Sequence, residues 1–164
     1  MPATMIDSAI FGSLWSQHTI KALFDDVART RAWLEIVAVL AEVQAEFTLI
    51  PAPAAHAIAL RCRELAIDAA FLEEMRIGRE ASGHSMQGMI RAVQSRLTPA
   101  DAQWVYAGAT VQDVTDTWMM LVLRTARQQI ERDLERVDQA MAVLALRYRD
   151  TPMAGRTHGQ QGLP

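Results

Sequence analysis

Three short segments of this 164-residue chain combine glycine with polar side chains that helix packing does not explain. They read SGHSMQG around His84, GATVQDVTDT from Gly108 to Thr117, and GRTHGQ from Gly155 to Gln160. Glycine frees the backbone for tight turns, and the polar side chains beside it can donate, accept or transfer protons. We therefore expect these segments to bind a small molecule or to take part in chemistry.

Two histidines in these segments are candidates for proton transfer. His158 follows the longest helical pattern of the chain, in a setting that leaves its imidazole free to face a cleft. Because histidine titrates near neutral pH, it can protonate a leaving group. The alternative for His158 is a surface histidine in a loop. The same alternative, or a core histidine bonded to a carbonyl, applies to His84.

The segment from Gly108 to Thr117 has the pattern of a helix start. Gly108 permits a tight entry, and Thr110 or Asp113 can cap the helix. The unpaired N–H groups of a first turn favour an anion, such as a substrate carboxylate. The alternative is that Thr110, Asp113 and Asp116 are only capping and first-turn residues.

Composition and charge narrow the class of protein. The formal net charge is -3 with acidic and basic residues interspersed, which gives no basic surface for nucleic acid. Cys62 is the single cysteine, and no His or Cys cluster has metal-ligand spacing. The N-terminus lacks a signal-peptide pattern, and no apolar run approaches the roughly 20 residues of a membrane span. We expect a cytoplasmic protein with no metal, nucleic-acid or membrane partner.

The elements that carry the three segments are predicted to be helices. Ala, Leu, Met, Glu, Gln and Arg recur at helical spacing and no sustained strand alternation occurs, which indicates an all-α fold. Asp25 and Asp26 suit the start of a helix that runs to about Thr48, and Pro51 and Pro53 interrupt the pattern. The other expected helices cover residues 17–24, 54–65, 69–79, 85–97 and 111–149.

The last of these helices is too long for a small domain. At 1.5 Å per residue it extends about 58 Å, compared with about 30 Å for a small domain. Its apolar residues alternate at four- and three-residue spacing, which is typical of a bundle seam. They are Ile130, Leu134, Val137, Met141, Leu144 and Tyr148. The seam needs helices from another copy or from sequence beyond these residues.

The order of these features resembles the fumarase/aspartase superfamily. The stretch LIPAPAA, the segment around His84, GATVQDVTDT before a very long helix, and GRTHGQ after it follow one another as in its adenylosuccinate lyase and 3-carboxy-cis,cis-muconate cycloisomerase branch. The resemblance implies an N-terminal helical domain over residues 1–107. It further implies that residues 108–164 begin a central helical bundle, so that the chain is the N-terminal part of a longer enzyme.

The resemblance also implies a chemistry. Members eliminate across a succinyl-type dicarboxylate and release fumarate or a related unsaturated acid, without a cofactor, in a homotetramer whose sites combine several subunits. His158 matches the general acid, and His84 matches a histidine that contacts substrate and can orient the acid. Thr110, Gln112, Thr157 and Gln160 match or adjoin substrate-binding positions. The base lies outside these residues, and we expect this chain alone to be inactive.

Several positions depart from the family pattern. Val111 stands where a serine is usual, Tyr106 where many members have histidine, and Ser85 where aspartate follows the histidine. These departures speak more against adenylosuccinate as substrate than against the superfamily. Bacterial cycloisomerases often have tryptophan where His158 lies, which favours a lyase.

Three functions remain in view at this point. The first is a lyase similar to adenylosuccinate lyase, and the second is a 3-carboxy-cis,cis-muconate cycloisomerase. The third belongs to a different class, a non-catalytic helical fragment that only self-associates. A fumarate absorbance assay separates the first two, and sedimentation bears on the third.

Overall fold

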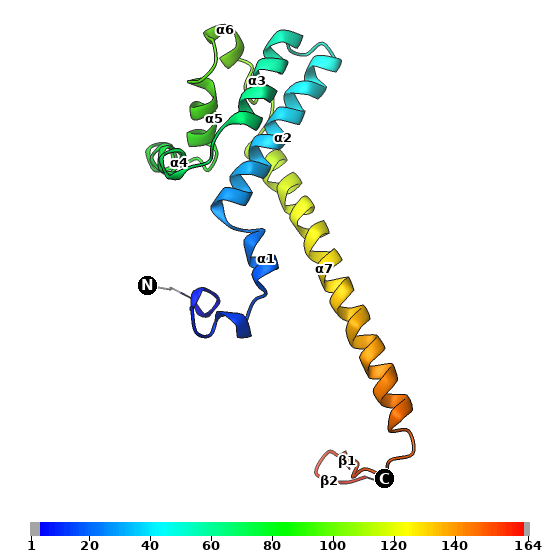
Figure 1. Cartoon of the computed structure of the whole chain (residues 1–164). Helices are drawn as coiled ribbons and strands as arrows, with labels where there is room; N and C mark the ends of the chain where they lie inside the picture. Colours follow the sequence, from blue (N-terminus) through cyan, green and yellow to red (C-terminus); the bar gives the residue numbers. More distant parts are fainter. Residues whose placement is uncertain (1–3, 163–164) are drawn as a thin grey trace. The chain divides into compact units, whose positions relative to one another are not determined.

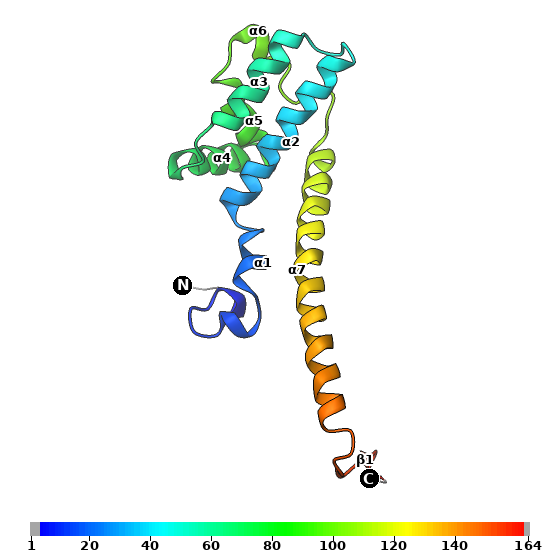
Figure 2. The ribbon, with the colours of Figure 1, turned by 45° about the vertical axis from the view of Figure 1, so that its right-hand side comes forward.

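The computed structural model describes residues 4–162, in which the regular structure is helical apart from two strands of two residues each (Figures 1 and 2). The all-α prediction is confirmed. Two 3-10 helices, η1 and η2, precede α1. In chain order the elements are η1 (Met5–Asp7), η2 (Gly12–Leu14), α1 (His18–Ala22), α2 (Asp26–Glu46), α3 (Ala52–Glu64), α4 (Ala69–Ser82), α5 (Gln87–Gln94), α6 (Pro99–Ala102), α7 (Val111–Arg147), β1 (Arg156–Thr157) and β2 (Gln160–Gln161).

The chain divides into two compact units, one up to Leu123 and one from Arg124 onward. The division falls inside α7, because only its first turns contribute to the core of the first unit. Val114, Trp118 and Val122 are the residues of α7 that are buried there. The domain division between residues 107 and 108 stays a prediction from the sequence.

The helix starts of the first unit follow local capping chemistry. Asp25 accepts a hydrogen bond from the Ala28 N–H at 2.7 Å, and Asp68 accepts one from the Phe71 N–H at 2.8 Å, so each acid satisfies a free first-turn donor. Pro51 precedes α3 in extended backbone. The expected helix start near Asp25 is confirmed.

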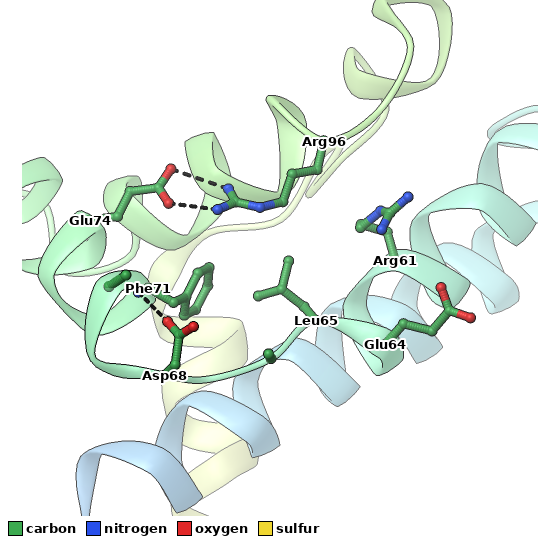
Figure 3. A pocket seen from close by; sticks show the side chains of 9 residues that line it. Arg61, Glu64, Leu65, Asp68, Phe71, Glu74 and Arg96 are labelled. Atoms are coloured by element: carbon green, nitrogen blue, oxygen red, sulfur yellow. Dashed lines mark hydrogen bonds and ion pairs between the residues drawn. The ribbon is translucent and has the colours of Figure 1, made fainter.

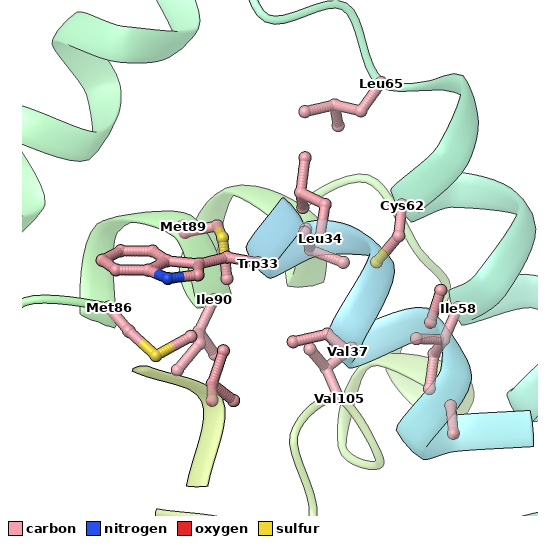
Figure 4. Close-up of a cluster of buried hydrophobic side chains, with 14 of the residues drawn as sticks. Trp33, Leu34, Val37, Ile58, Cys62, Leu65, Met86, Met89, Ile90 and Val105 are labelled. Atoms are coloured by element: carbon pink, nitrogen blue, oxygen red, sulfur yellow. The ribbon is translucent and has the colours of Figure 1, made fainter. Parts of the chain in front are cut away.

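The core of the first unit is built around α2 and α3, which form an antiparallel pair in both views (Figures 1 and 2). Small alanines such as Ala38 on α2 and Ala59 on α3 are buried in this core, and their short side chains take little space between the helices. Figure 4 shows the surrounding side chains, including Leu34, Ile58 and Met86, none of which is exposed. Tight packing of this kind stabilises by burying apolar area, about 25 cal/mol per Å².

Cys62 belongs to this core as a packing residue. Its side chain has no exposed surface, and burial raises the pKa of the thiol to about 12. A thiol in this state is not a nucleophile at neutral pH. The free cysteine therefore contributes to packing and lies outside any reactive site.

Three details differ from the sequence-based expectations. The short helix α6 starts at Pro99, where Thr98 caps it through the Asp101 N–H at 3.3 Å; none of the helices expected from the sequence covers this segment. Helix α5 is shorter than the range 85–97, because residues 84–86 form a turn. The segment after α7 is not an open loop, since β1 and β2 pair as a small antiparallel hairpin.

Over residues 4–162, none of the helices combines the length and apolar character needed to cross a membrane. The cytoplasmic location stays a prediction.

Candidate active site

The first predicted site residue, His84, lies in the turn between α4 and α5. Gly83 ends α4 with φ 69°, a left-handed conformation that glycine adopts without strain. The His84 N–H donates to Ser82 Oγ at 3.2 Å, and His84 Nδ1 accepts from the Met86 N–H at 3.3 Å. The imidazole is half-buried. His84 is therefore not a loose surface histidine. Among the described residues, its ring bonds to a backbone N–H and not to a carbonyl.

The backbones of α4 and α5 meet directly beneath this turn. A Cβ on Gly78 would lie 2.4 Å from Gly88 Cα, and a Cβ on Gly88 would lie 2.4 Å from the Met75 carbonyl oxygen. Contacts this short with backbone atoms leave no room for a side chain. Glycine at both positions lets the two helices approach and fixes the frame that carries His84.

The second predicted group lies at the start of α7. The Thr110 N–H donates to Asp113 Oδ2 at 2.8 Å, and the Asp113 N–H donates to the Thr110 carbonyl at 3.1 Å. This is the returning half of a capping box, so Asp113 has the structural role that the sequence allowed. The side chains of Thr110 and Gln112 are exposed and have no hydrogen-bond partner among residues 4–162, which leaves them available for a ligand.

The loop before α7 holds a feature that the sequence did not reveal. Tyr106 has φ 63°, a left-handed conformation that is strained for any residue with a Cβ, and its buried hydroxyl has no partner among the described residues. Burial raises the pKa of this phenol, and the negative charge of Asp113 adds to the effect. The Gln44 amide holds the same loop by donating to the Ala107 carbonyl at 2.7 Å, although the two residues are 63 positions apart in sequence.

The third predicted group forms the hairpin in the second unit. Thr157 pairs with Gln160 across β1 and β2, and His158 and Gly159 form the turn between them. Gly159 has φ 76°, which accounts for glycine there. The three predicted side chains of this group, those of Thr157, His158 and Gln160, are exposed. The hairpin presents them together at its end, a geometry the sequence had suggested only as a loop.

The structure places the predicted residues in two units and brings together only those of the hairpin. Thr157, His158 and Gln160 share the hairpin of the second unit, whereas His84, Thr110 and Gln112 belong to the first unit. No hydrogen bond joins His84 to Thr110 or Gln112 in the part of the chain that the structure describes. The structure therefore tests neither their roles nor their assembly into one site.

The pocket in Figure 3 lies elsewhere in the first unit and contains none of these residues. Three of its charged side chains have internal partners: Arg96 forms two hydrogen bonds with Glu74, at 3.2 and 2.9 Å, and Asp68 caps α4. Arg96 also stacks 5.7 Å from the centre of the Phe71 ring. These contacts hold the segment after α5 against α4, and we interpret the pocket as structural.

Comparison with known proteins decides the family. The sequence profile of a family described as Lyase matches residues 10–164, which includes all three segments. The chain belongs to the fumarase/aspartase superfamily of lyases. The helical fold agrees, since the superfamily member described as a fumarate lyase from Mesorhizobium sp. BNC1 superposes with a TM-score of 0.81 at 33% identity, over 91% of this chain and 34% of that one.

Curated relatives in the superfamily carry several activities. The chain is 35% identical to N-acetyl-S-(2-succino)cysteine lyase of Enterococcus italicus over 100% of its length and 35% of the relative. It is 33% identical to nitrosuccinate lyase of Streptomyces davaonensis, over 99% of this chain and 34% of the relative. With 3-carboxy-cis,cis-muconate cycloisomerase of Pseudomonas aeruginosa the identity is 32%, over 94% and 34%. The chain spans about a third of the length of these relatives.

Proposed function

We propose that this superfamily chain is the part of a lyase that supplies an acid and substrate-binding groups for elimination from a succinyl-type dicarboxylate. The observation that carries the proposal is the match to relatives whose names specify lyases of a succino-cysteine and of nitrosuccinate. Both matches extend across the segments of His84, Thr110 and His158. The product is fumarate or a related unsaturated acid.

The proposed elimination moves one proton off carbon and, where needed, one onto the leaving group. A base removes the proton beside one carboxylate, the bond to the leaving group breaks, and the electron pair forms the carbon–carbon double bond. His158 protonates the departing atom, because a histidine near neutral pH serves both as donor and as acceptor. Its position at the exposed end of the hairpin leaves it free to reach a bound molecule.

The remaining residues are proposed to hold the substrate. Thr110 and Gln112 stand with free side chains at the start of α7, where first-turn N–H groups favour a carboxylate. Thr157 and Gln160 flank the acid on paired strands, so they can fix the leaving group relative to His158. His84 contributes from the turn that follows α4.

We also propose that the enzyme is a homo-oligomer, with a tetramer expected. The seam residues Ile130, Leu134 and Met141 are 54, 61 and 64% exposed, which a monomer rarely tolerates as a continuous stripe. Because the resemblance to the superfamily implies sites that combine several subunits, we propose that Thr110 of one copy and His158 of another contribute to one site.

The second candidate is a cycloisomerase acting on a carboxylated muconate. It is favoured by the 32% identity to the Pseudomonas aeruginosa enzyme over 94% of this chain. His158 favours the lyase, because bacterial cycloisomerases often have tryptophan at this position.

The test is an absorbance assay of the complete enzyme that contains this chain. Fumarate formation from S-succino-cysteine compounds or nitrosuccinate supports the lyase. If only 3-carboxy-cis,cis-muconate is turned over, the enzyme is a cycloisomerase and not a lyase. If the protein assembles stably but turns over none of these compounds, self-association is its only supported function.

A further inference from the structure

The turn that carries His84 is a chain of three hydrogen bonds. Ser82 Oγ donates to the Gly78 carbonyl at 2.7 Å and accepts from the His84 N–H at 3.2 Å. The Met86 N–H then donates to His84 Nδ1 at 3.3 Å. Met86 itself has no exposed surface, so the residue that supplies the last donor is anchored in the core. The imidazole is thereby held from its Nδ1 side.

This geometry decides which ring nitrogen carries the proton. A backbone N–H has no lone pair and can only donate, so Nδ1 must be the acceptor. In a neutral imidazole the proton then resides on Nε2. Nε2 has no partner among residues 4–162, so His84 presents one unsatisfied N–H donor from a half-buried ring.

The frame around the turn keeps that donor in place. Gly78, whose carbonyl begins the hydrogen-bond chain, is in backbone contact with Gly88 of α5. Because the two helix backbones approach closely at these glycines, the α4–α5 packing holds Ser82 and Met86 relative to one another. A donor on a rigid element loses little entropy when it binds a ligand.

We propose that Ser82 and the Met86 N–H are positioning groups that fix His84 as an Nε2–H donor, and that His84 donates to a substrate carboxylate and accepts no proton during turnover. The inference deepens the proposed elimination and rests on it for the identity of the acceptor. It assigns different roles to the two histidines: His158 transfers a proton, whereas His84 binds an anion. A donor to a charged group is worth more than one to a neutral group.

The first experiment does not depend on activity. The chain has four histidines, so nitrogen-15 spectra of their side chains can be assigned with His84→Gln removing one set of signals. We expect neutral His84 to carry its proton on Nε2, with Nδ1 unprotonated. A proton on Nδ1, or an even mixture of the two forms, overturns the proposal whatever the enzyme's substrate is.

Amide hydrogen exchange then tests the part of Ser82. Ser82→Ala removes the acceptor of the His84 N–H and should speed exchange of the Met86 amide about fivefold, as expected for loss of one hydrogen bond. Ser82→Thr, which keeps the hydroxyl, should restore protection. Ser95→Ala is the matched control, because Ser95 also donates to a carbonyl near a helix end, that of Ala92 at 3.0 Å, away from the turn. Unchanged Met86 exchange in Ser82→Ala contradicts the role of Ser82.

Kinetics of the complete enzyme test the part of His84. The amide nitrogen of Gln reaches the place of Nε2, whereas that of Asn reaches only the place of Nδ1. We expect His84→Asn to lower kcat/KM about 10- to 100-fold and His84→Gln less than tenfold, since only the Gln donor is kept. His56→Gln is the control, because His56 is exposed and has no assigned role. Equal losses of about 10²- to 10⁴-fold in Gln and Asn variants indicate proton transfer and overturn the proposal. If no substrate turns over at all, the proposed function fails while the tautomer result stands.

Discussion

The two halves of helix α7 have similar apolar spacing and opposite environments. In the first unit Val114, Trp118 and Val122 are 1, 6 and 7% exposed, and the Trp118 ring meets Trp33 edge to face with centres 6.2 Å apart. Beyond Leu123, Ile130 and the residues that continue the stripe are more than half exposed. One continuous helix thus completes a core at one end and offers an uncovered seam at the other.

The difference shows that an apolar stripe in the sequence indicates which residues need packing partners. It does not indicate whether those partners belong to the same chain. In the first unit α2 and the rings around Trp118 cover the stripe. In the second unit the other regular elements described are the two hairpin strands, which pair with each other. The first half of the stripe therefore serves folding of the first unit, and we propose that the second half serves association between copies.

The largest expected effect concerns the hairpin of the second unit. Replacing His158 by Gln keeps a hydrogen-bonding side chain but cannot deliver a proton, so turnover of S-succino compounds by the complete enzyme should fall 10²- to 10⁴-fold. Nitrosuccinate should lose much less, because its leaving group departs as a stable anion. Steady-state assays on both substrates measure this, and near-normal turnover of the S-succino compound would remove His158 from the acid role.

A matched pair of truncations contrasts folding and association along α7. Trp118→Ala removes a large buried ring and should lower the free energy of unfolding by about 3 to 5 kcal/mol. Leu134→Ala, in the exposed half, should change it by less than about 0.5 kcal/mol in the dissociated chain. Urea unfolding at low protein concentration gives both values. Similar losses in the two variants would mean that the halves of α7 are not distinct.

Charges on the seam should change assembly and leave the first unit intact. Leu134→Glu combined with Met141→Glu places two carboxylates in the stripe, and a desolvated unpaired charge opposes association. Sedimentation should show dissociation, while the helical circular dichroism of the first unit persists. A native chain that sediments as a stable monomer at micromolar concentration would refute the proposed association.

The glycine contact beneath His84 gives a smaller effect. Gly88→Ala places a Cβ 2.4 Å from the Met75 carbonyl oxygen, so α4 and α5 must separate, at about 1 to 3 kcal/mol. Gly162→Ala is the control from the second unit, since its nearest contact is an ordinary 3.4 Å to Thr157. Thermal unfolding should separate the two variants. An unaffected Gly88→Ala protein would show that the frame of His84 is not rigid.

The smallest expected effect is an increase in the free energy of unfolding. Tyr106→Phe deletes a buried hydroxyl that has no partner among residues 4–162, so the free energy of unfolding should rise by about 1 kcal/mol. Tyr148→Phe, at a residue that is 51% exposed, should leave the free energy of unfolding unchanged. Denaturant unfolding checks both, and a destabilised Tyr106→Phe protein would reveal that the hydroxyl is satisfied by an internal water.

The elements were more predictable than the site because helix periodicity and capping are local. Asp25 and the start of α7 at Val111 follow from neighbouring residues, and the all-α class is confirmed on the same basis. The strained backbone of Tyr106 and its pinning by Gln44 depend on contacts between distant parts of the chain. The hairpin around His158 was missed because two-residue strands are too short to show an alternating pattern.

The site residues were predicted from motif order and stay predictions, although their local settings are now known. Thr110 and His158 are exposed and free to bind, but the sequence of a single chain contains no information on which copy supplies each. That assignment depends on how the exposed half of α7 is covered.

Complementation of two inactive variants tests the central claim, that one active site draws on the first unit of one copy and the second unit of another. Thr110→Glu blocks the carboxylate position by charge repulsion, and His158→Gln removes the acid. Complete enzymes carrying one change each are dissociated, mixed in equal amounts and reassembled, and fumarate formation is measured. If the two residues come from different copies, roughly a quarter of the sites regain both native residues by random mixing, and activity returns. Absence of any recovery in mixed assemblies would show that a single copy supplies both residues and would contradict the account.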